Sequence, residues 1–221
     1  MNLRILGCNG PYPGAGGACS GYLLSSGEDR VLLDCGAGVL GRLMARMDPA
    51  RLTAVLLSHA HADHASDMMV FSYLLDIRRQ GEELPPLPVY APRDEDSPVL
   101  RFLAQAKGFS LRLIEAGDVL TLGKLRARCV PARHPVPALG FRIGPLGYTG
   151  DTNTLDALAE AYRGVALLLA AGCLLPAQWR EEGPHMGALQ AAQLARDAGA
   201  RRLMLTHLRP DVDEATLLSG A

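Results

Sequence analysis

Long hydrophobic runs, an excess of charge of one sign and paired cysteines are all missing from this chain of 221 residues. The longest apolar run, Val165 to Ala171, is far shorter than the roughly 20 residues that a membrane-spanning helix needs. Residues 1–6 lead straight into a strand-like run, without the apolar region of a secretory signal. We therefore expect no membrane segment and a cytoplasmic protein.

Charge and cysteine usage exclude two further classes of protein. The chain has 22 Lys and Arg against 23 Asp and Glu, a net charge of −1, so nothing attracts the whole molecule to nucleic acid, although a local basic patch stays open. The cysteines are odd in number and lack CxxC spacing, which argues against a disulfide framework and a zinc ribbon. We expect buried free thiols at Cys8, Cys19, Cys35, Cys129 and Cys173.

Apolar residues make up 48% of the chain and charged residues 20%, which is typical of a soluble globular protein. No linker or low-complexity tract divides it, so we expect a single domain over residues 1–221. Predicted strands are Leu3–Gly7, Val31–Asp34, Ala54–Ser58, Val89–Ala91, an antiparallel meander within Leu111–Thr149, Val165–Ala170 and Arg202–Leu205. Predicted helices are Ala65–Arg79, Pro98–Lys107, Leu155–Tyr162 and Ala188–Ala198. This alternation predicts an α/β (α+β) fold in which two packed sheets carry helices on their outer faces, a four-layer αββα sandwich.

The strongest chemical signal is the segment Ser-His-Ala-His-Ala-Asp-His at Ser58–His64, which directly follows an apolar strand. Strand geometry is expected to send His59 and His61 to one side, and the turn into the next helix to return Asp63 and His64 to the same place. Burying three imidazoles and a carboxylate is costly unless a divalent metal satisfies them. A solvated histidine-rich loop is the alternative, and the apolar strand that feeds the segment argues against it.

The chain has only three other histidines, His134, His185 and His207, and each follows a strand-like or turn segment. A lone histidine at a strand end is usually structural, but a second metal needs further ligands of this kind. Asp151 closes an apolar run in a tight turn and offers another carboxylate. Its alternative role is that of a turn or helix-capping aspartate.

Together these motifs resemble a known superfamily over Leu3 to about Pro210. They occur along the chain as five blocks: Leu33–Gly36, His59–His64, His134, Gly150–Thr152 and Thr206–His207. In this order they are similar to the metallo-β-lactamase-fold superfamily of dinuclear metallohydrolases. The segment Gly183–Leu208, with a histidine before an alanine-rich helix and a Leu-Thr-His strand end, resembles the ribonuclease Z branch, which is related to the phosphoribosyl cyclic-phosphate phosphodiesterases. The resemblance implies the metallo-β-lactamase fold and hydrolysis of phosphodiesters.

The resemblance also implies a role for each residue of the motifs. The first metal would be held by His59, His61 and His134, and the second by Asp63, His64 and His207. Asp151 would bridge the two ions, Asp34 would orient the histidine loop by hydrogen bonds, and His185 would face the substrate phosphate. The expected catalytic residues are Asp63, Asp151 and His185. Ala62 stands where iron-containing relatives that handle oxygen carry Glu, so two divalent ions, Zn²⁺ or alternatively Mn²⁺, are expected.

The predicted activity is that of a dinuclear metal-dependent hydrolase, a phosphodiesterase for small or cyclic phosphodiesters or short nucleic acid. Two ions sharing a water lower its pKa towards about 7, which makes hydroxide available at neutral pH. Lactone, thioester or β-lactam hydrolysis on the same metals stays open, because a fold does not determine its substrate. A non-catalytic metal-containing binding or sensing protein is a further alternative. A tRNA 3′-processing endonuclease is disfavoured, because the long arm of ribonuclease Z is missing between His134 and Asp151.

Two departures from the family pattern and two arginines carry expectations of their own. Ala171 replaces the Glu that braces the extra histidine in ribonuclease Z, so Glu181 or Glu182 is expected to take that role for His185. Arg142 and Arg209 are candidate phosphate contacts, with a solvated surface position as the alternative. The chain ends soon after His207, so the edge of the second sheet is either incomplete or finished by a partner, and a homodimer is one such arrangement.

Overall fold

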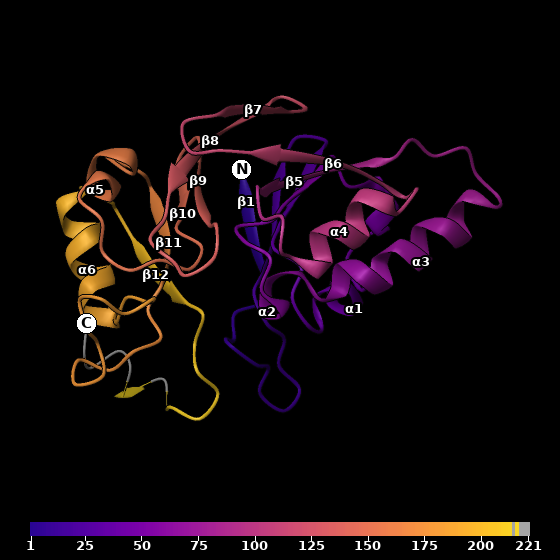
Figure 1. Cartoon of the computed structure of the whole chain (residues 1–221). Coiled ribbons are helices and arrows are strands. Elements are labelled where there is room, and N and C mark those ends of the chain that lie inside the picture. Colours follow the sequence, from indigo (N-terminus) through magenta and orange to yellow (C-terminus); the bar gives the residue numbers. More distant parts are fainter. Residues whose placement is uncertain (214, 217–221) are drawn as a thin grey trace.

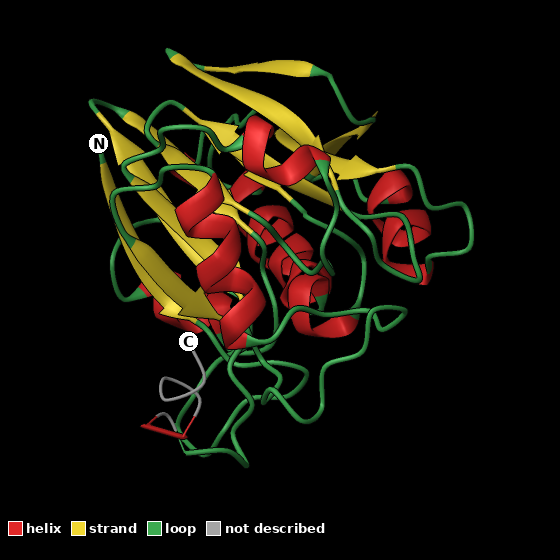
Figure 2. Ribbon diagram, turned by 90° about the vertical axis from the view of Figure 1, so that its left-hand side faces the viewer, coloured by secondary structure: helices red, strands yellow, loops and turns green. Residues whose placement is uncertain are grey.

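The structure, a computed structural model, describes residues 1–213 and 215–216. Two six-stranded sheets lie face to face in the middle of the molecule, and helices cover the outer face of each (Figures 1 and 2). The predicted four-layer αββα architecture is therefore confirmed. In the part of the chain that is described, none of the helices combines the length and the hydropathy that crossing a bilayer requires. The C-terminal segment Leu217–Ala221, on which the expectation about the sheet edge depends, lies outside the described residues.

The first sheet contains the strands of the N-terminal half. In spatial order they are β1 (Asn2–Gly7), β2 (Gly21–Ser26), β3 (Asp29–Leu33), β4 (Ala54–Leu56), β5 (Leu87–Pro92) and β6 (Phe109–Ile114). The pairs β1–β2 and β2–β3 are antiparallel, and the pairs from β3 to β6 are parallel. The connecting segments contain α1 (Val39–Met44), the 3-10 helix η1 (Pro49–Arg51), α2 (Ala62–Ala65), α3 (Asp67–Arg79) and α4 (Pro98–Gln105). Parallel strands need such crossovers, and here α1, α3 and α4 cover the outer face.

The second sheet contains the strands of the C-terminal half. In spatial order they are β12 (Leu203–Thr206), β11 (Leu167–Ala171), β10 (Leu146–Tyr148), β9 (Leu139–Ile143), β8 (Leu125–Pro131) and β7 (Val119–Leu122). The strands from β7 to β10 form an antiparallel meander, and β10, β11 and β12 are parallel. Two helices, α5 (Ala157–Ala161) and α6 (Ala188–Asp197), lie on its outer face (Figure 1).

Three hydrophobic clusters fill the spaces between the four layers, and the side chains of strand β2 contribute to two of these clusters. Its residues alternate, so that Leu23 packs towards the helices while Tyr22 and Leu24 pack between the sheets. A third cluster fills the space between the second sheet and helices α5 and α6. Because both faces of each sheet are covered, the central strands are apolar throughout, and each fully buried leucine contributes about 1.5–3 kcal/mol.

The structure corrects four expectations about individual elements. Strand β2 and helix α1 were not predicted, because β2 is apolar on both faces and α1 is a short helix that contains Gly41. The predicted helix Ala65–Arg79 begins at Asp67 as α3, and a separate short helix, α2, ends at Ala65 before it. Strand β6 pairs in parallel with β5 and belongs to the first sheet, so the meander begins at Val119. Short apolar runs do not reveal which sheet they join, because that depends on distant partners.

Candidate metal centre

The predicted site residues lie at one edge of the sandwich, where strands of both sheets end. The parallel strands of each sheet have their carboxyl ends at this edge, so loops from distant parts of the chain meet there. The residues are Asp34 after β3, His59 and His61 after β4, Asp63 and His64 on α2, His134 after β8, Asp151 after β10, His185 between β11 and α6, and His207 after β12.

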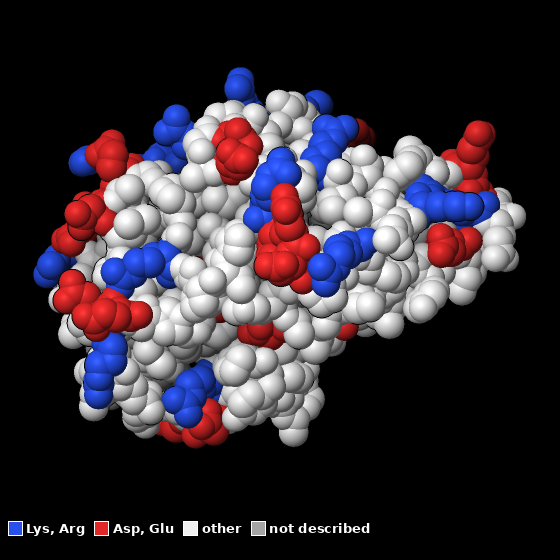
Figure 3. Space-filling model, viewed as in Figure 1, with Lys and Arg blue, Asp and Glu red and all other residues white. Residues whose placement is uncertain are grey.

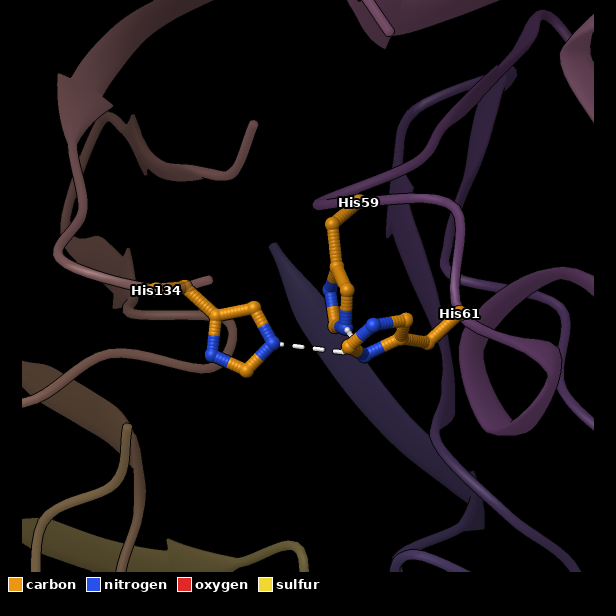
Figure 4. A group of neighbouring side chains, drawn as sticks. All are labelled: His59, His61 and His134. Carbon is orange, nitrogen blue, oxygen red and sulfur yellow. Dashed lines mark hydrogen bonds between the residues drawn. The ribbon is translucent and has the colours of Figure 1, made fainter. Parts of the chain in front are cut away.

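Three histidines converge in the first group, His59, His61 and His134 (Figure 4). His61 Nδ1 lies 3.1 Å from His59 Nε2 and 3.2 Å from His134 Nε2. Ligand atoms of a tetrahedral zinc ion are roughly 3.3 Å apart, given Zn–N bonds of about 2.0–2.1 Å. The expectation that strand geometry aligns His59 and His61 is wrong, because β4 ends at Leu56 and both residues lie in the following loop.

A second group consists of Asp63, His64, Asp151 and His207, all buried. His207 Nε2 lies 3.0 Å from Asp63 Oδ2 and 3.1 Å from Asp151 Oδ2. His64 Nε2 lies 3.5 Å from both Asp63 Oδ2 and Asp151 Oδ1. Asp151 Oδ2 is also 3.9 Å from His59 Nε2, so this carboxylate stands between the two groups.

The potential ligand atoms of the second group suit a bound cation. His64 Nε2 and Asp151 Oδ1 are buried and have no hydrogen-bond partner, which is costly in a polar site unless a ligand satisfies them. Burial opposes protonation of His207, but Asp151 and Asp63 outweigh it and raise the pKa of His207 to about 10. The pKa of His64 is likewise raised, because Asp151 and Asp34 outweigh its burial. The site therefore attracts positive charge, which divalent metal ions would supply.

Asp34 supports the second group from behind. Its Oδ2 atom lies 2.8 Å from His64 Nδ1, and its carboxylate accepts hydrogen bonds from the backbone and hydroxyl of Ser58 at 2.6 and 2.8 Å. The hydroxyl of Tyr148, from the other sheet, also donates to Asp34. These contacts match the orienting role expected for Asp34. No local motif of the sequence marks Tyr148. Asp34 and His207 have φ angles of 56° and 57°, a left-handed conformation that is uncommon for residues other than glycine.

Gly10 makes room for the imidazole of His207. A Cβ atom at position 10 would lie 2.2 Å from His207 Nε2, so only glycine fits beside this ring. The sequence predicts only an irregular glycine-rich loop between Asn9 and Ser20 and gives no sign of this contact. Thr206, the residue before His207, is held in turn by a hydrogen bond to the Tyr22 hydroxyl.

His185 lies against the cluster from the second sheet. Its Nδ1 atom is 3.6 Å from Asp151 Oδ2, and its ring stacks on that of His207 with centroids 5.3 Å apart. Burial lowers the pKa of His185 to about 4, although Asp151 acts in the opposite direction. The imidazole is therefore neutral at pH 7 and can donate a hydrogen bond. The expectation that Glu181 or Glu182 braces His185 is not met, because both are exposed and the carboxylate beside its ring is that of Asp151.

The two arginines suggested as phosphate contacts are engaged elsewhere. Arg142 donates to the carbonyl of Ala161 at the end of α5, and Arg209 pairs with Asp211. A different arginine, Arg133, lies beside the cluster. It helps to line a cavity of about 410 Å³, whose walls are Arg133, His134, Pro135, Glu182, Gly183 and Pro184. In the sequence, only its place next to His134 marks Arg133.

No disulfide joins the cysteines of the described residues, and four of them, Cys19, Cys35, Cys129 and Cys173, are buried as predicted, whereas Cys8 is partly exposed. Cys173 is the one that approaches the centre. It forms a group with His185 and His207 in which the potential ligand atoms lie within 4.8 Å of one another.

Comparison with known proteins places these features in a family. Residues 29–208 match the family model described as Beta-lactamase superfamily domain. The "Probable metallo-hydrolase YhfI" of Bacillus subtilis is 30% identical, over 94% of this chain and 87% of its own length. The crystal structure of YhfI, described as a metallo-beta-lactamase fold protein, superimposes with a TM-score of 0.90 at 29% identity, covering 99% of this chain and 90% of that one.

Two more distant structures share the fold. The short form of human tRNase Z has a TM-score of 0.77 at 21% identity, covering 95% of this chain and 93% of its own. A diphosphatase of the PhnP family also has a TM-score of 0.77, at 18% identity, covering 95% of this chain and 87% of that one. At these identities the likeness extends to the fold alone.

Proposed function

Since this chain belongs to the metallo-β-lactamase-fold hydrolases of the ribonuclease Z branch, we propose that it is a dinuclear metal-dependent phosphodiesterase. Its substrates in this proposal are small or cyclic phosphodiesters or short nucleic acid. The metal ions are two divalent cations, with Zn²⁺ preferred and Mn²⁺ as the alternative, because imidazole and carboxylate ligands suit both.

In this proposal the two groups of side chains each hold one ion. His59, His61 and His134 would hold the first, and Asp63, His64 and His207 would hold the second. Asp151 would serve both, because its carboxylate stands between the groups. Two observations support this assignment. The ring nitrogens of the first group are 3.1 and 3.2 Å apart, as ligands of one ion would be, and His64 Nε2 and Asp151 Oδ1 are buried without a hydrogen-bond partner.

The proposed chemistry divides between the ions and the protein. When bound, two divalent ions activate a water and neutralise charge on the phosphoryl oxygens. Asp63 and Asp151 contribute the negative charge that holds the ions, and Asp34 keeps the Nε2 lone pair of His64 free by accepting from its Nδ1–H. His185, neutral and beside Asp151, donates a hydrogen bond to the phosphate or to the leaving oxygen as its charge develops.

The position of His185 is the observation that carries the proposal of a phosphodiesterase. A phosphodiester that loses an alkoxide benefits from a donor at the leaving oxygen, whereas a thioester, which loses a thiolate, has less need of one. The preference for small substrates rests on other features. The cavity beside His134 measures about 410 Å³, and the segment from His134 to Asp151 forms only β9 and β10. On the face shown in Figure 3, basic and acidic side chains alternate, unlike the basic stripe of a nucleic-acid binder.

The names of the more distant relatives favour phosphate chemistry as well. One is a tRNase Z and another a diphosphatase, so both act on phosphorus–oxygen bonds. For this chain we disfavour tRNA processing, because the long arm of ribonuclease Z is missing between His134 and Asp151. Hydrolysis of lactones, thioesters or β-lactams and a non-catalytic role are the outcomes that would replace the proposal.

A substrate panel tests the proposed function. The protein is loaded with Zn²⁺ or Mn²⁺, its metal content is measured, and it is assayed against bis(p-nitrophenyl) phosphate, 2′,3′- and 3′,5′-cyclic nucleotides, a precursor tRNA, a lactone and a β-lactam. We expect two ions per chain and hydrolysis of the small phosphodiesters. The variant His185→Ala should retain both ions and lose about 10²-fold in kcat on the 2′,3′-cyclic nucleotide, whose leaving group is an alkoxide.

Each other outcome of the panel has a definite meaning. Acyl hydrolysis without phosphodiester hydrolysis would move the protein to the second class of enzyme. Two bound ions without turnover on any substrate would favour the non-catalytic role. Wild-type rates in His185→Ala would remove His185 from the mechanism.

A further inference from the structure

Asn153, a buried residue outside the histidine cluster, connects the cluster to the loop that carries His185. Its side chain is fully buried, two residues after Asp151. The loop runs between β11 and α6, and a backbone bridge between Leu174 and Gly187 closes its base. His185 lies inside the closed loop, so its position depends on the contacts that hold the loop against the sheet.

The nitrogen of the Asn153 carboxamide lies at the centre of a turn of this loop. Nδ2 donates to the backbone carbonyls of Arg180 at 2.9 Å, Glu181 at 3.2 Å and Gly183 at 2.7 Å. A primary amide has two N–H groups, so three carbonyls share its two donors. One side chain thereby fixes the turn that comes directly before Pro184 and His185.

The oxygen of the same carboxamide is occupied as well. Oδ1 accepts from the indole Nε1–H of Trp179 at 2.9 Å and from the backbone N–H of Thr154 at 2.7 Å. This arrangement determines the orientation of the amide, because the oxygen faces two donors and the nitrogen faces carbonyl oxygens. An aspartate at position 153 would match the shape but would place an oxygen against those carbonyls, which costs both the hydrogen bonds and a repulsive contact.

The loop is held on the other side of His185 by the residue before Asn153. The carbonyl of Thr152 accepts from the backbone N–H of Met186, the neighbour of His185, at 2.9 Å. Asn153 contacts the loop of His134 through its backbone and not its side chain: its N–H donates to the carbonyl of Arg133 at 3.0 Å. A change of the Asn153 side chain therefore acts on the loop of His185 and leaves the backbone contact beside His134 in place.

We infer that Asn153 is a positioning residue, whose carboxamide clamps the turn between Trp179 and Gly183 and so holds the His185 imidazole beside Asp151, in reach of the substrate phosphate. The inference rests on the proposed function for the role of His185, but the clamp itself is a property of the loop. Asn153 makes no contact with the reacting atoms and acts through His185.

The chain contains a built-in reporter of this clamp. Trp179 is its single tryptophan, and its indole N–H is bound directly to Asn153. Intrinsic fluorescence therefore reads the state of the turn in the unlabelled protein, without requiring any catalytic activity.

The variants Asn153→Asp and Asn153→Ala test the inference in the full-length, metal-loaded protein. We expect two ions to remain bound and the Trp179 emission to shift to longer wavelength with easier quenching by acrylamide. Hydrolysis of a nucleoside 2′,3′-cyclic phosphate, which releases an alkoxide, should fall by about 10²-fold, and that of bis(p-nitrophenyl) phosphate by less than about 3-fold, because a nitrophenolate leaves without a donor. In a His185→Ala background the substitution should cause no further loss.

Two further variants keep the test decisive. The Ser97 hydroxyl caps α4 by accepting from the backbone N–H of Leu100. Ser97→Ala removes this cap and so lowers the stability of the other half of the protein, but it should leave the ratio of the two hydrolysis rates unchanged. If both Asn153 variants fail to fold, Trp179→Phe removes one bond of the clamp and should give a smaller loss with the same leaving-group pattern. Unchanged rates on both substrates, or equal losses on both, would overturn the inference.

Failure of the proposed function gives a different result. A metal-loaded wild-type protein that hydrolyses neither phosphodiester would reject the phosphodiesterase and with it the role of His185. The fluorescence change in Asn153→Asp would still show whether the carboxamide holds the loop. Unchanged fluorescence and quenching in that variant would reject the clamp itself.

Discussion

The carboxylate of Asp34 lies 2.8 Å from Nδ1 of His64, and both side chains are buried. Asp34 follows β3 and His64 belongs to α2, so the contact joins two separate loops of the first sheet. By accepting from Nδ1–H, Asp34 orients the ring so that Nε2 faces Asp63 and Asp151. The Tyr148 hydroxyl binds the same carboxylate from the second sheet, so this pair also couples the two sheets.

Asp34→Asn should lower metal affinity by about 10–100-fold, because the amide no longer holds His64 in the required tautomer. Competition with a chromogenic chelator measures the affinity. Tyr148→Phe serves as the matched variant, since it removes one donor to Asp34 and keeps the carboxylate, and its effect should be smaller. Equal affinities in the wild type and Asp34→Asn would contradict the orienting role.

Gly10→Ala should weaken the second metal position, because the added Cβ would lie 2.2 Å from His207 Nε2 and displace the ring. We expect loss of one ion per chain and of most activity, with the circular dichroism spectrum preserved. Gly41→Ala, in helix α1, is the matched control, since nothing lies within 4 Å of its Cβ position. A Gly10→Ala protein with two ions and normal activity would show that His207 tolerates displacement.

Asp151→Ala should release at least one ion and abolish activity while the fold is retained, because the remaining ligands would face two cations without the bridging carboxylate. Inductively coupled plasma mass spectrometry gives the stoichiometry, and circular dichroism the fold. Asp76→Ala, at an exposed position of α3, removes a carboxylate remote from the cluster and should keep both ions. The bridging role would have to be abandoned for an active Asp151→Ala protein with two ions.

The stability of the metal-free protein should fall as the pH rises above neutrality. Burial opposes protonation of His207, but Asp151 and Asp63 raise its pKa to about 10, whereas an unfolded histidine titrates near about 6.5. The folded state thus holds this proton more tightly, and the resulting stabilisation is complete below about pH 6.5 and is lost as the pH approaches about 10.

Urea denaturation at several pH values between about 7 and 9.5 measures this loss. The midpoint of the metal-free protein should decrease across this range, and that of the metal-loaded protein should change less, because an ion at His207 would take the place of the proton. His207→Ala should make the decrease smaller without abolishing it, because His64, whose pKa is also raised, contributes as well. A midpoint of the metal-free wild type that stays constant would show that the carboxylates do not raise the pKa of His207.

The sequence by itself was sufficient for the chemistry of the centre. His59, His61, Asp63 and His64 lie within six residues, so their proximity follows from the length of the chain between them. The other residues of the centre follow predicted strands, and the ordered blocks identified the family and hence the four-layer fold. Their assignment as ligands remains a prediction, which the metal analyses above are designed to test.

Only the tertiary structure decided which distant residues serve that centre. Tyr148 reaches Asp34 across 114 positions of sequence, Gly10 lies against His207, and strand β6 joins the first sheet instead of the meander. Nothing local marks these residues, because a tyrosine or glycine obeys the same backbone preferences wherever it occurs. Packing of the two sheets brings them to one edge, and the contacts made there arise from burial and shape, which no short stretch of chain contains.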